Sequence, residues 1–308
     1  MKVGILGTGD MGKPLVRRLL KENIPVYIKK KIYDPGQRVT KSLKKAGAVV
    51  LDTIFEVGKA VDVIITELPK SPISPVLEEI ILGEKGLLKS MSPGNIIIEA
   101  GNTSPTVTKK LAAACKEKDI GFLDAPMSGG PQGAASGNLT IFVGGDKSHL
   151  EKVMPILEKC GSIHHFGGPG AGQTAKLANN MIVAINLAGL SEALVFAKKM
   201  GVDIKLLFEG LCKGAANSWV LQNYGNDIIQ RNIDKVDEEN RHSSILDIDG
   251  RDRQLFWALD LGSKIDVPLP ITMAAHELYK MARAAGKRGI NESVTKYLED
   301  LAGVKVEG

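Results

Sequence analysis

Short runs of β-branched residues alternate with longer amphipathic segments over the first half of the chain. Each run is bounded by glycine, proline or polar residues, and a helix-like segment (11–23) follows the first run. This alternation is typical of βαβ units and predicts a mostly parallel sheet. The expected strands are VGIL (3–6), KIYD (31–34), VDVIIT (61–66), NIIIE (95–99), FLDAP (122–126) and LTIFVGG (139–145).

The pattern changes after GGPGAG (167–172), where apolar positions recur at helical spacing. The helices expected there span 172–199, 203–213, 217–230, 246–264, 269–286 and 292–302. The sequence therefore predicts an α/β fold with two domains. An N-terminal Rossmann domain with a doubly wound sheet (1–166) is followed by an all-α domain (167–308), and a long interdomain helix joins them.

The long helix is apolar nearly all round from Met181 to Ala197, which predicts burial between neighbouring helices. Its length would also suit a membrane span. Five polar side chains argue against insertion because each would be costly in hydrocarbon: Asn179, Asn180, Asn186, Ser191 and Glu192. We therefore expect no membrane partner.

Composition narrows the class of protein. A chain of 308 residues with 44% apolar and 24% charged residues has room for two ordinary cores, and its opening lacks the pattern of a signal peptide, so we expect a cytoplasmic protein. Cys115, Cys160 and Cys212 lie far apart and show no metal-ligand spacing, so no metal site is predicted. A net charge of +5 with only 5% aromatic residues does not favour nucleic-acid binding, but it suits a small anionic substrate.

The segment GTGDMG (7–12) carries the first candidate chemistry. It follows a predicted strand and opens a predicted helix, so its glycines fall where a tight turn and a close approach to a diphosphate are needed. The helix N-terminus would then face the phosphates. The predicted cofactor-binding residues of this turn are Gly7, Thr8, Gly9, Asp10, Met11 and Gly12.

Asp34 in KIYDPG is placed to accept hydrogen bonds from ribose hydroxyls and to repel a 2′-phosphate. This favours NAD over NADP. The lysine run 29–31 and Arg38 surround Asp34 with positive charge, so the sequence leaves NADP open.

The loop DAPMSGGPQGA (124–134) follows another predicted strand. The backbone N–H groups of Ser128, Gly129 and Gly130 could form an anion-binding nest for a substrate carboxylate, although an ordinary glycine-proline loop would have the same composition.

Lys176 lies near the start of the long helix among Ala175, Leu177 and Ala178. Most helical lysines are solvated. On this apolar helix, however, Asn180 lies one turn after Lys176 on the same face, and Asn179 is adjacent to Asn180. Partial desolvation would lower the pKa of the lysine and make it a usable proton donor near neutral pH. We therefore expect Lys176 to be catalytic, with Asn179 and Asn180 contacting the substrate.

These stretches together resemble the β-hydroxyacid dehydrogenase family over nearly the whole chain. The matching motifs are GTGDMGKPL, ELP (67–69), DAPMSGGPQGAASGNLTIFVGG, GPGAGQTAKLANNM, EALVFAKKMGVD and VPLPITMAAHELYKMARAAG. The resemblance implies NAD(P)-dependent interconversion of a small β-hydroxyacid and its semialdehyde or ketone. It also implies the fold predicted above and a homodimer or homotetramer packed through the helical domains.

The same resemblance implies residue roles. Lys176 matches the family's catalytic lysine, Asn180 matches the asparagine that helps to hold the substrate, and residues 128–130 match the carboxylate loop. Leu68 and Pro69 match the segment beside the cofactor, and Asn102 could contact the nicotinamide side of the site.

Two departures from the family pattern keep alternatives open. Gly101–Asn102 is closer to the Gly-Gly-Asn of 6-phosphogluconate dehydrogenase, which leaves open an oxidative decarboxylase. A separate alternative is a non-catalytic NAD-binding module that has kept the fold and lost the chemistry. Arg253–Gln254 replaces the usual Lys-Asp pair, so Arg253 joins the predicted cofactor-binding residues. A further hypothesis is that an arginine near this segment recognises a second anionic group, although a charged surface turn would also explain these residues: Arg231, Arg241, Arg251 and Arg253.

Overall fold

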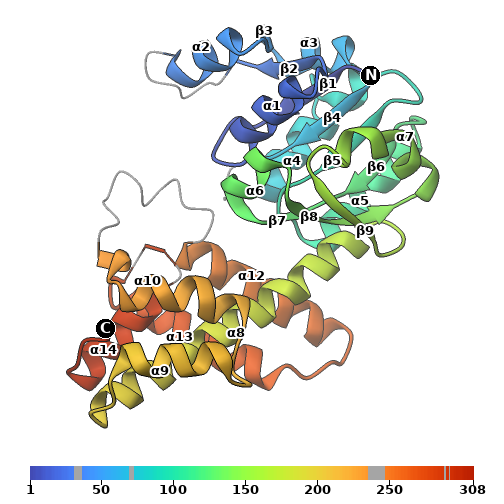
Figure 1. Cartoon of the computed structure of the whole chain (residues 1–308). Coiled ribbons are helices and arrows are strands. Elements are labelled where there is room, and N and C mark those ends of the chain that lie inside the picture. Colours follow the sequence, from blue (N-terminus) through green and yellow to red (C-terminus); the bar gives the residue numbers. More distant parts are fainter. Residues whose placement is uncertain (31–36, 69–72, 235–246, 288, 291) are drawn as a thin grey trace. The chain divides into compact units, whose positions relative to one another are not determined.

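The structure is a computed structural model that describes residues 1–30, 37–68, 73–234, 247–287, 289–290 and 292–308 (Figure 1). It divides into two compact units, Met1–Lys176 and Leu177–Gly308. The division falls inside the long helix α8 (Ala171–Lys199), whereas the sequence analysis places the domain boundary at the glycine-rich turn before it.

The first unit is built on one twisted sheet whose strands follow the order β3-β2-β1-β4-β5-β6-β8-β7, with β9 paired to β8. The first six strands in this order are parallel and connected by helices, which is the doubly wound arrangement that the sequence predicts. Its strands are β1 (Val3–Leu6), β2 (Val26–Lys29), β3 (Val49–Leu51), β4 (Val63–Thr66), β5 (Ile96–Glu99), β6 (Gly121–Asp124), β7 (Met127–Ser128), β8 (Leu139–Gly145) and β9 (Gly161–His165).

Helices cover this sheet (Figure 1). Their apolar faces bury the continuous β-branched strands β1, β4 and β5, which is the pattern expected of a parallel sheet covered on both sides. The helices are α1 (Gly12–Lys21), α2 (Arg38–Lys45), α3 (Ile54–Ala60), α4 (Ile73–Leu82), the 3₁₀ turn η2 (Leu87–Lys89), α5 (Pro105–Lys116), α6 (Gly130–Ser136) and α7 (Lys147–Leu157).

The predicted strands at 3–6, 61–66, 95–99, 122–126 and 139–145 are found with ends shifted by at most two residues. The strand expected at 31–34 lies outside the described residues, and the observed β2 ends earlier, at Lys29. Strands β3, β7 and β9 were not predicted. β3 and β7 are very short, and β9 reads GSIHH, so its pairing with the long β8 outweighs a weak intrinsic preference for strand.

The second unit is helical, apart from an isolated bridge between Asp247 and Ile290, in the part of the chain that the structure describes. All six predicted helical segments are found, with 217–230 forming a π-helical turn followed by a short α-helix. After α8 its elements are α9 (Ile204–Lys213), η3 (Leu221–Gly225), α10 (Asn226–Ile229), η4 (Asn232–Asp234), α12 (Ile248–Lys264), α13 (Pro270–Ala284) and α14 (Ser293–Ala302).

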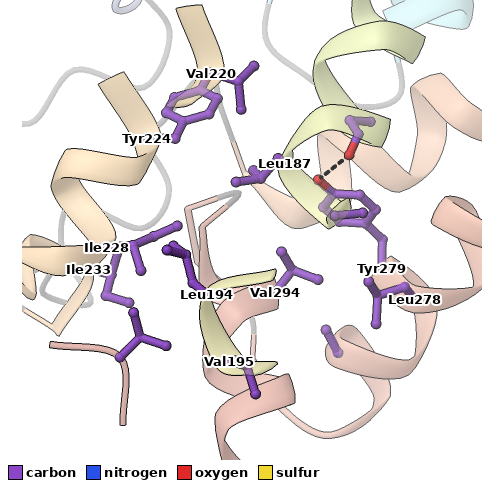
Figure 2. Close-up of a cluster of buried hydrophobic side chains, with 14 of the residues drawn as sticks. Leu187, Leu194, Val195, Val220, Tyr224, Ile228, Ile233, Leu278, Tyr279 and Val294 are labelled. Carbon is purple, nitrogen blue, oxygen red and sulfur yellow. Dashed lines mark hydrogen bonds between the residues drawn. The ribbon is translucent and has the colours of Figure 1, made fainter. Parts of the chain in front are cut away.

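The core of this unit forms around α8, as Figure 2 shows. Leu187 and Leu194 on α8 contact apolar side chains from η3, α10, α13 and α14. The hydroxyl of Tyr279 donates a hydrogen bond to the Ala184 carbonyl, and Ser191 is hydrogen-bonded to Thr295 at 2.8 Å. The polar groups that α8 brings into this core therefore have partners.

Among the described residues, α8 is long and apolar enough to cross a membrane by length and composition alone. The core helix of a soluble protein passes the same test, so this property gives weak support for a membrane span. Figure 2 shows which α8 side chains pack against protein neighbours, Leu187 and Leu194 among them.

We expect Leu187→Ala to lower the free energy of unfolding of the helical unit by about 2–5 kcal/mol, because the fully buried side chain would leave a cavity. Urea unfolding followed by circular dichroism measures this change. Leu301→Ala is the matched control because Leu301 is 68% exposed, and it should change the free energy by less than about 0.5 kcal/mol. Equal losses in the two variants would contradict the assigned core.

Candidate active site

The glycine-rich turn between β1 and α1 has the shape that a dinucleotide requires. Gly7 has φ +105°, and a Cβ there would lie 1.8 Å from the Glu67 carbonyl oxygen. A Cβ on Gly12 would lie 1.8 Å from the Gly7 carbonyl oxygen, whereas one on Gly9 would meet no atom within 4 Å. Gly7 and Gly12 are thus required by the close passage of the backbone, and Gly9 leaves open space beside the helix N-terminus for phosphate oxygens.

The other predicted cofactor-binding residues of unit 1 are placed as follows. Thr8 and Met11 are buried, whereas Asp10 is exposed. The Leu68 amide nitrogen lies 3.4 Å from the position of a Cβ on Gly7, so this backbone passes beside the turn. Predictions for Asp34 and Pro69 lie outside the described residues.

Asn102 carries an unsatisfied polar atom. Its Oδ1 is buried and has no hydrogen-bond partner within the described ranges. Buried amide oxygens are normally satisfied, so this atom is available to a bound group that supplies a donor, such as a carboxamide. Together with the glycine turn, it fits a nicotinamide dinucleotide.

A buried carboxylate holds the start of α8. The side chain of Asp124, at the end of β6, accepts hydrogen bonds from the Gly170 and Gln173 amides, each at 2.8 Å. These amides belong to the helix N-terminus, where N–H groups have no partner within the helix and the helix dipole favours negative charge. Burial raises the pKa of Asp124, and the hydrogen bonds from the backbone lower it.

Gln173 links the same helical turn to the end of β5. Its Nε2 donates to Glu99 Oε2 and to the Gly101 carbonyl at 2.7 Å, and its Oε1 accepts from the Thr103 amide at 3.2 Å. Glu99 also accepts from the Thr103 hydroxyl at 2.9 Å. Burial raises the pKa of Glu99 well above its usual value, and the hydrogen bonds from Thr103 and Gln173 lower it. The first turn of α8 is therefore fixed by side chains from two strands.

Lys176 lies one turn further along α8 and is only 7% exposed. Its Nζ is 5.5 Å from the centroid of the Phe142 ring, within the range of a cation–π contact. Its charge also interacts with Glu67, which directly follows β4. Burial raises the pKa of the Glu67 carboxyl to about 8, and the Lys176 ammonium lowers it by a smaller amount.

The predicted carboxylate loop contains two glycines in conformations that other residues rarely adopt. Gly129 has φ +122° and Gly130 has φ +65°, directly after Ser128 at the end of β7. A Cβ on Gly129 would also lie 3.2 Å from Leu139 Cδ2. The backbone here makes a tight turn in a conformation that favours glycine.

In the second unit, Asn180 is buried and Asn179 half-buried, and Asn179 Nδ2 donates to Asn180 Oδ1 at 3.2 Å. The Asn180 carbonyl accepts a hydrogen bond from Arg251 Nη1 at 3.2 Å. Arg253, predicted to bind cofactor, is half-buried on α12.

Sequence reasoning missed the residues that hold α8 in place. Glu99 and Asp124 stand at the ends of apolar strands, and an acidic residue in that position was a usable signal. Gln173 had no signal of its own, because its role depends on the spatial pairing of strands that are distant in sequence. Glu67 lies inside the ELP segment, but only the tertiary structure shows that it is near Lys176.

Two family models together cover most of the chain. Residues 2–168 match the NAD binding domain of 6-phosphogluconate dehydrogenase, and residues 170–298 match the model described as NAD-binding of NADP-dependent 3-hydroxyisobutyrate dehydrogenase.

Characterised relatives agree with these matches. The chain is 33% identical over 310 residues to 2-(hydroxymethyl)glutarate dehydrogenase of Eubacterium barkeri, covering 100% of this chain and 98% of that protein. It is 34% identical over 308 residues to 2-hydroxy-3-oxopropionate reductase of Escherichia coli, covering 99% and 100%. Among solved structures, Mycobacterium tuberculosis 3-hydroxyisobutyrate dehydrogenase with L-serine superposes with a TM-score of 0.80 at 25% identity, covering 96% and 98%. The chain belongs to the β-hydroxyacid dehydrogenase family, as its motifs imply.

Proposed function

We propose that this protein is an NAD(P)-dependent oxidoreductase that interconverts a small β-hydroxyacid and its semialdehyde or ketone. The observation that carries the proposal is the buried Lys176 on a helix whose first turn is fixed by Asp124 and Gln173. A bound nicotinamide dinucleotide supplies the hydride donor or acceptor, and the protein supplies orientation and proton transfer.

Lys176 Nζ gives a proton to the alkoxide oxygen during reduction and takes the hydroxyl proton during oxidation. The amides of Ser128, Gly129 and Gly130 bind the substrate carboxylate, and Asn180 orients the hydroxyl group. A cation in a poorly solvated setting suits this task, because an oxyanion developing beside it is stabilised more strongly than in water.

The family and its relatives support use of NAD(P). The preference for NAD over NADP rests on Asp34 and remains part of the proposal. The 6-phosphogluconate dehydrogenase-like decarboxylase and the non-catalytic module are less favoured, because the relatives that match over the full chain are named as hydroxyacid dehydrogenases and reductases.

We also propose a homo-oligomer that packs through the helical units. Exposed residues recur along α8 at alternating steps of three and four, which is the spacing of a helix–helix seam: Ile182, Asn186, Gly189, Ala193 and Phe196. Ile182 and Phe196 are 60% and 69% exposed in the single chain. A second copy of this chain would cover this apolar stripe.

Lys176→Ala should lower kcat/KM by about 10²–10⁴-fold, the range expected when a general acid–base group is removed. NADH affinity, measured by fluorescence titration, should stay unchanged. Turnover is measured with NAD and NADP over a panel of hydroxyacids and semialdehydes. The exposed Lys147→Ala is the control for lost charge, and equal activity of the two variants would contradict the assigned role.

The Glu67 carboxyl should make stability depend on pH. Its pKa is raised to about 8 in the folded chain, so the folded state holds this proton more tightly than the unfolded state does. The resulting stabilisation is complete below pH 4.5, the ordinary pKa of a glutamate, and is lost as the pH rises through about 8. Glu67→Gln cannot ionise, so the wild type should lose stability relative to this variant between these pH values.

Urea unfolding of both proteins at several pH values measures this difference. Glu117→Gln, at an exposed position, should follow the wild type. The burial assigned to Glu67 would be refuted if the free energy of unfolding of the wild type differed from that of Glu67→Gln by the same amount at every pH between 4.5 and 8.

Phe196→Glu should dissociate the proposed oligomer, because a carboxylate would be buried against the apolar stripe of the second copy. Sedimentation velocity measures the change in mass. Val49→Glu, which places the same charge at an exposed apolar position in the first unit, should leave the mass unchanged. A wild type that sediments as a monomer at all concentrations would show that the stripe has another purpose.

A further inference from the structure

Arg251 is a deeply buried cation in the first turn of α12. Only 4% of this residue is exposed. The turn is held by Asp247, whose carboxylate accepts a hydrogen bond from the Gly250 amide at 2.7 Å. The guanidinium therefore extends from a well-fixed piece of backbone into the interior of the helical unit.

The hydrogen bonds of Arg251 go to neutral groups. Nη1 donates to the Asn180 carbonyl at 3.2 Å and to Gln254 Oε1 at 3.3 Å. Nε is buried and has no hydrogen-bond partner, and no acidic side chain in the described ranges forms an ion pair with this guanidinium. The adjacent carboxylate of Asp252 pairs instead with His276 and Arg283.

Glu292 is near enough to interact with the charge of Arg251, but it forms no ion pair with it. Burial raises the pKa of Glu292 to about 7, so this carboxyl is only partly ionised near neutral pH. Its Oε2 is itself buried without a partner among the described residues. Glu292 therefore does not supply a full compensating charge.

A buried cation without an anionic partner is costly, since desolvation removes the hydration that a charged group has at the surface. Native chains keep such a group where a bound anion completes the site. The guanidinium also presents a planar fork of donors, which matches a carboxylate.

The other arginines considered from the sequence do not fit this role as well. Arg231 is paired with Glu299 at 2.5 Å and donates to the Val306 carbonyl at 3.1 Å. Arg241 lies outside the described residues. Arg253 is half-buried, so it carries a smaller desolvation cost.

Arg251 contacts a residue that the proposed function assigns to the substrate, because its Nη1 donates a hydrogen bond to the Asn180 carbonyl. One guanidinium surrounded by neutral groups balances one negative charge, which favours a carboxylate over a phosphate monoester that carries nearly two.

We propose that Arg251 binds a second carboxylate of the substrate, so that the enzyme acts on dicarboxylic β-hydroxyacids. This inference rests on the proposed function, which assigns Asn180, the residue that Arg251 contacts, to the substrate. Arg251 then sets specificity by binding the distal end of the molecule and takes no part in proton transfer.

Kinetics with a matched substrate pair test the proposal. 2-(Hydroxymethyl)glutarate carries two carboxylates, and its 5-amide has nearly the same shape with one negative charge. The wild type should prefer the diacid, and Arg251→Gln should lower kcat/KM for the diacid by about 100-fold while changing the value for the amide little. Lys264→Gln removes an exposed charge from the same helix and should leave the preference unchanged.

Binding of glutarate and butyrate provides a readout that does not depend on turnover. Calorimetry in the presence of NADH should show that glutarate binds the wild type more tightly than butyrate does, and that Arg251→Gln loses this difference. Should Arg251→Gln fail to fold, Arg251→Lys replaces it, because a point charge without the planar fork should weaken glutarate binding and leave butyrate binding unchanged.

The outcomes separate the two proposals. Turnover of monocarboxylic hydroxyacids with no preference for the diacid, or a preference that survives in Arg251→Gln, would overturn the role of Arg251 and leave the proposed function intact. The absence of turnover in the wild type for every hydroxyacid tested, with either cofactor, would overturn the proposed function itself.

Discussion

The candidate site depends on the hydrogen bonds by which the carboxylate of Asp124, at the end of β6, holds the start of α8. This carboxylate accepts two amide hydrogen bonds from a helix N-terminus and is fully buried, so the favourable helix dipole and the hydrogen bonds must offset its desolvation. Gln173 adds a connection from the same turn to Glu99 and to the loop after β5. Lys176 is three residues beyond this anchor, and a rigid helical turn transmits the anchored position to its side chain.

The surroundings of Lys176 are consistent with the proton-transfer role proposed for it. The side chain lies against the Phe142 ring and is almost excluded from water. Burial raises the pKa of the nearby Glu67 carboxyl to about 8, and the charge of Lys176 lowers it by a smaller amount. An oxyanion that develops beside a poorly solvated ammonium is stabilised more strongly than in water.

Much of the architecture could be predicted from the sequence because its determinants are local. The GTGDMG turn, the β-branched strands and the helical spacing after residue 167 each act over a few neighbouring residues. The burial of Lys176 also followed from its apolar neighbours. β9 could not be predicted, because GSIHH becomes a strand only through its pairing with β8.

The buried polar network could not be derived in the same way. Glu99 and Asp124 stand opposite each other because the register of β5 and β6 aligns them, and Gln173 reaches both from a helix some fifty residues after β6 in the sequence. Among the arginines near α12, only tertiary packing distinguishes the buried Arg251 from the ion-paired Arg231. The substrate specificity proposed for Arg251 depends on which side chains are left without partners after folding.

The most direct test of the central claim is a double-mutant cycle on single-turnover hydride transfer, using Gln173→Ala, Lys176→Ala and the double variant. If Gln173 acts by positioning Lys176, Gln173→Ala should slow hydride transfer at least about tenfold in the wild-type background and have little effect when Lys176 is already absent. Equal slowing in both backgrounds would show that Gln173 supports the fold in general, and the account of an anchored lysine would then be wrong.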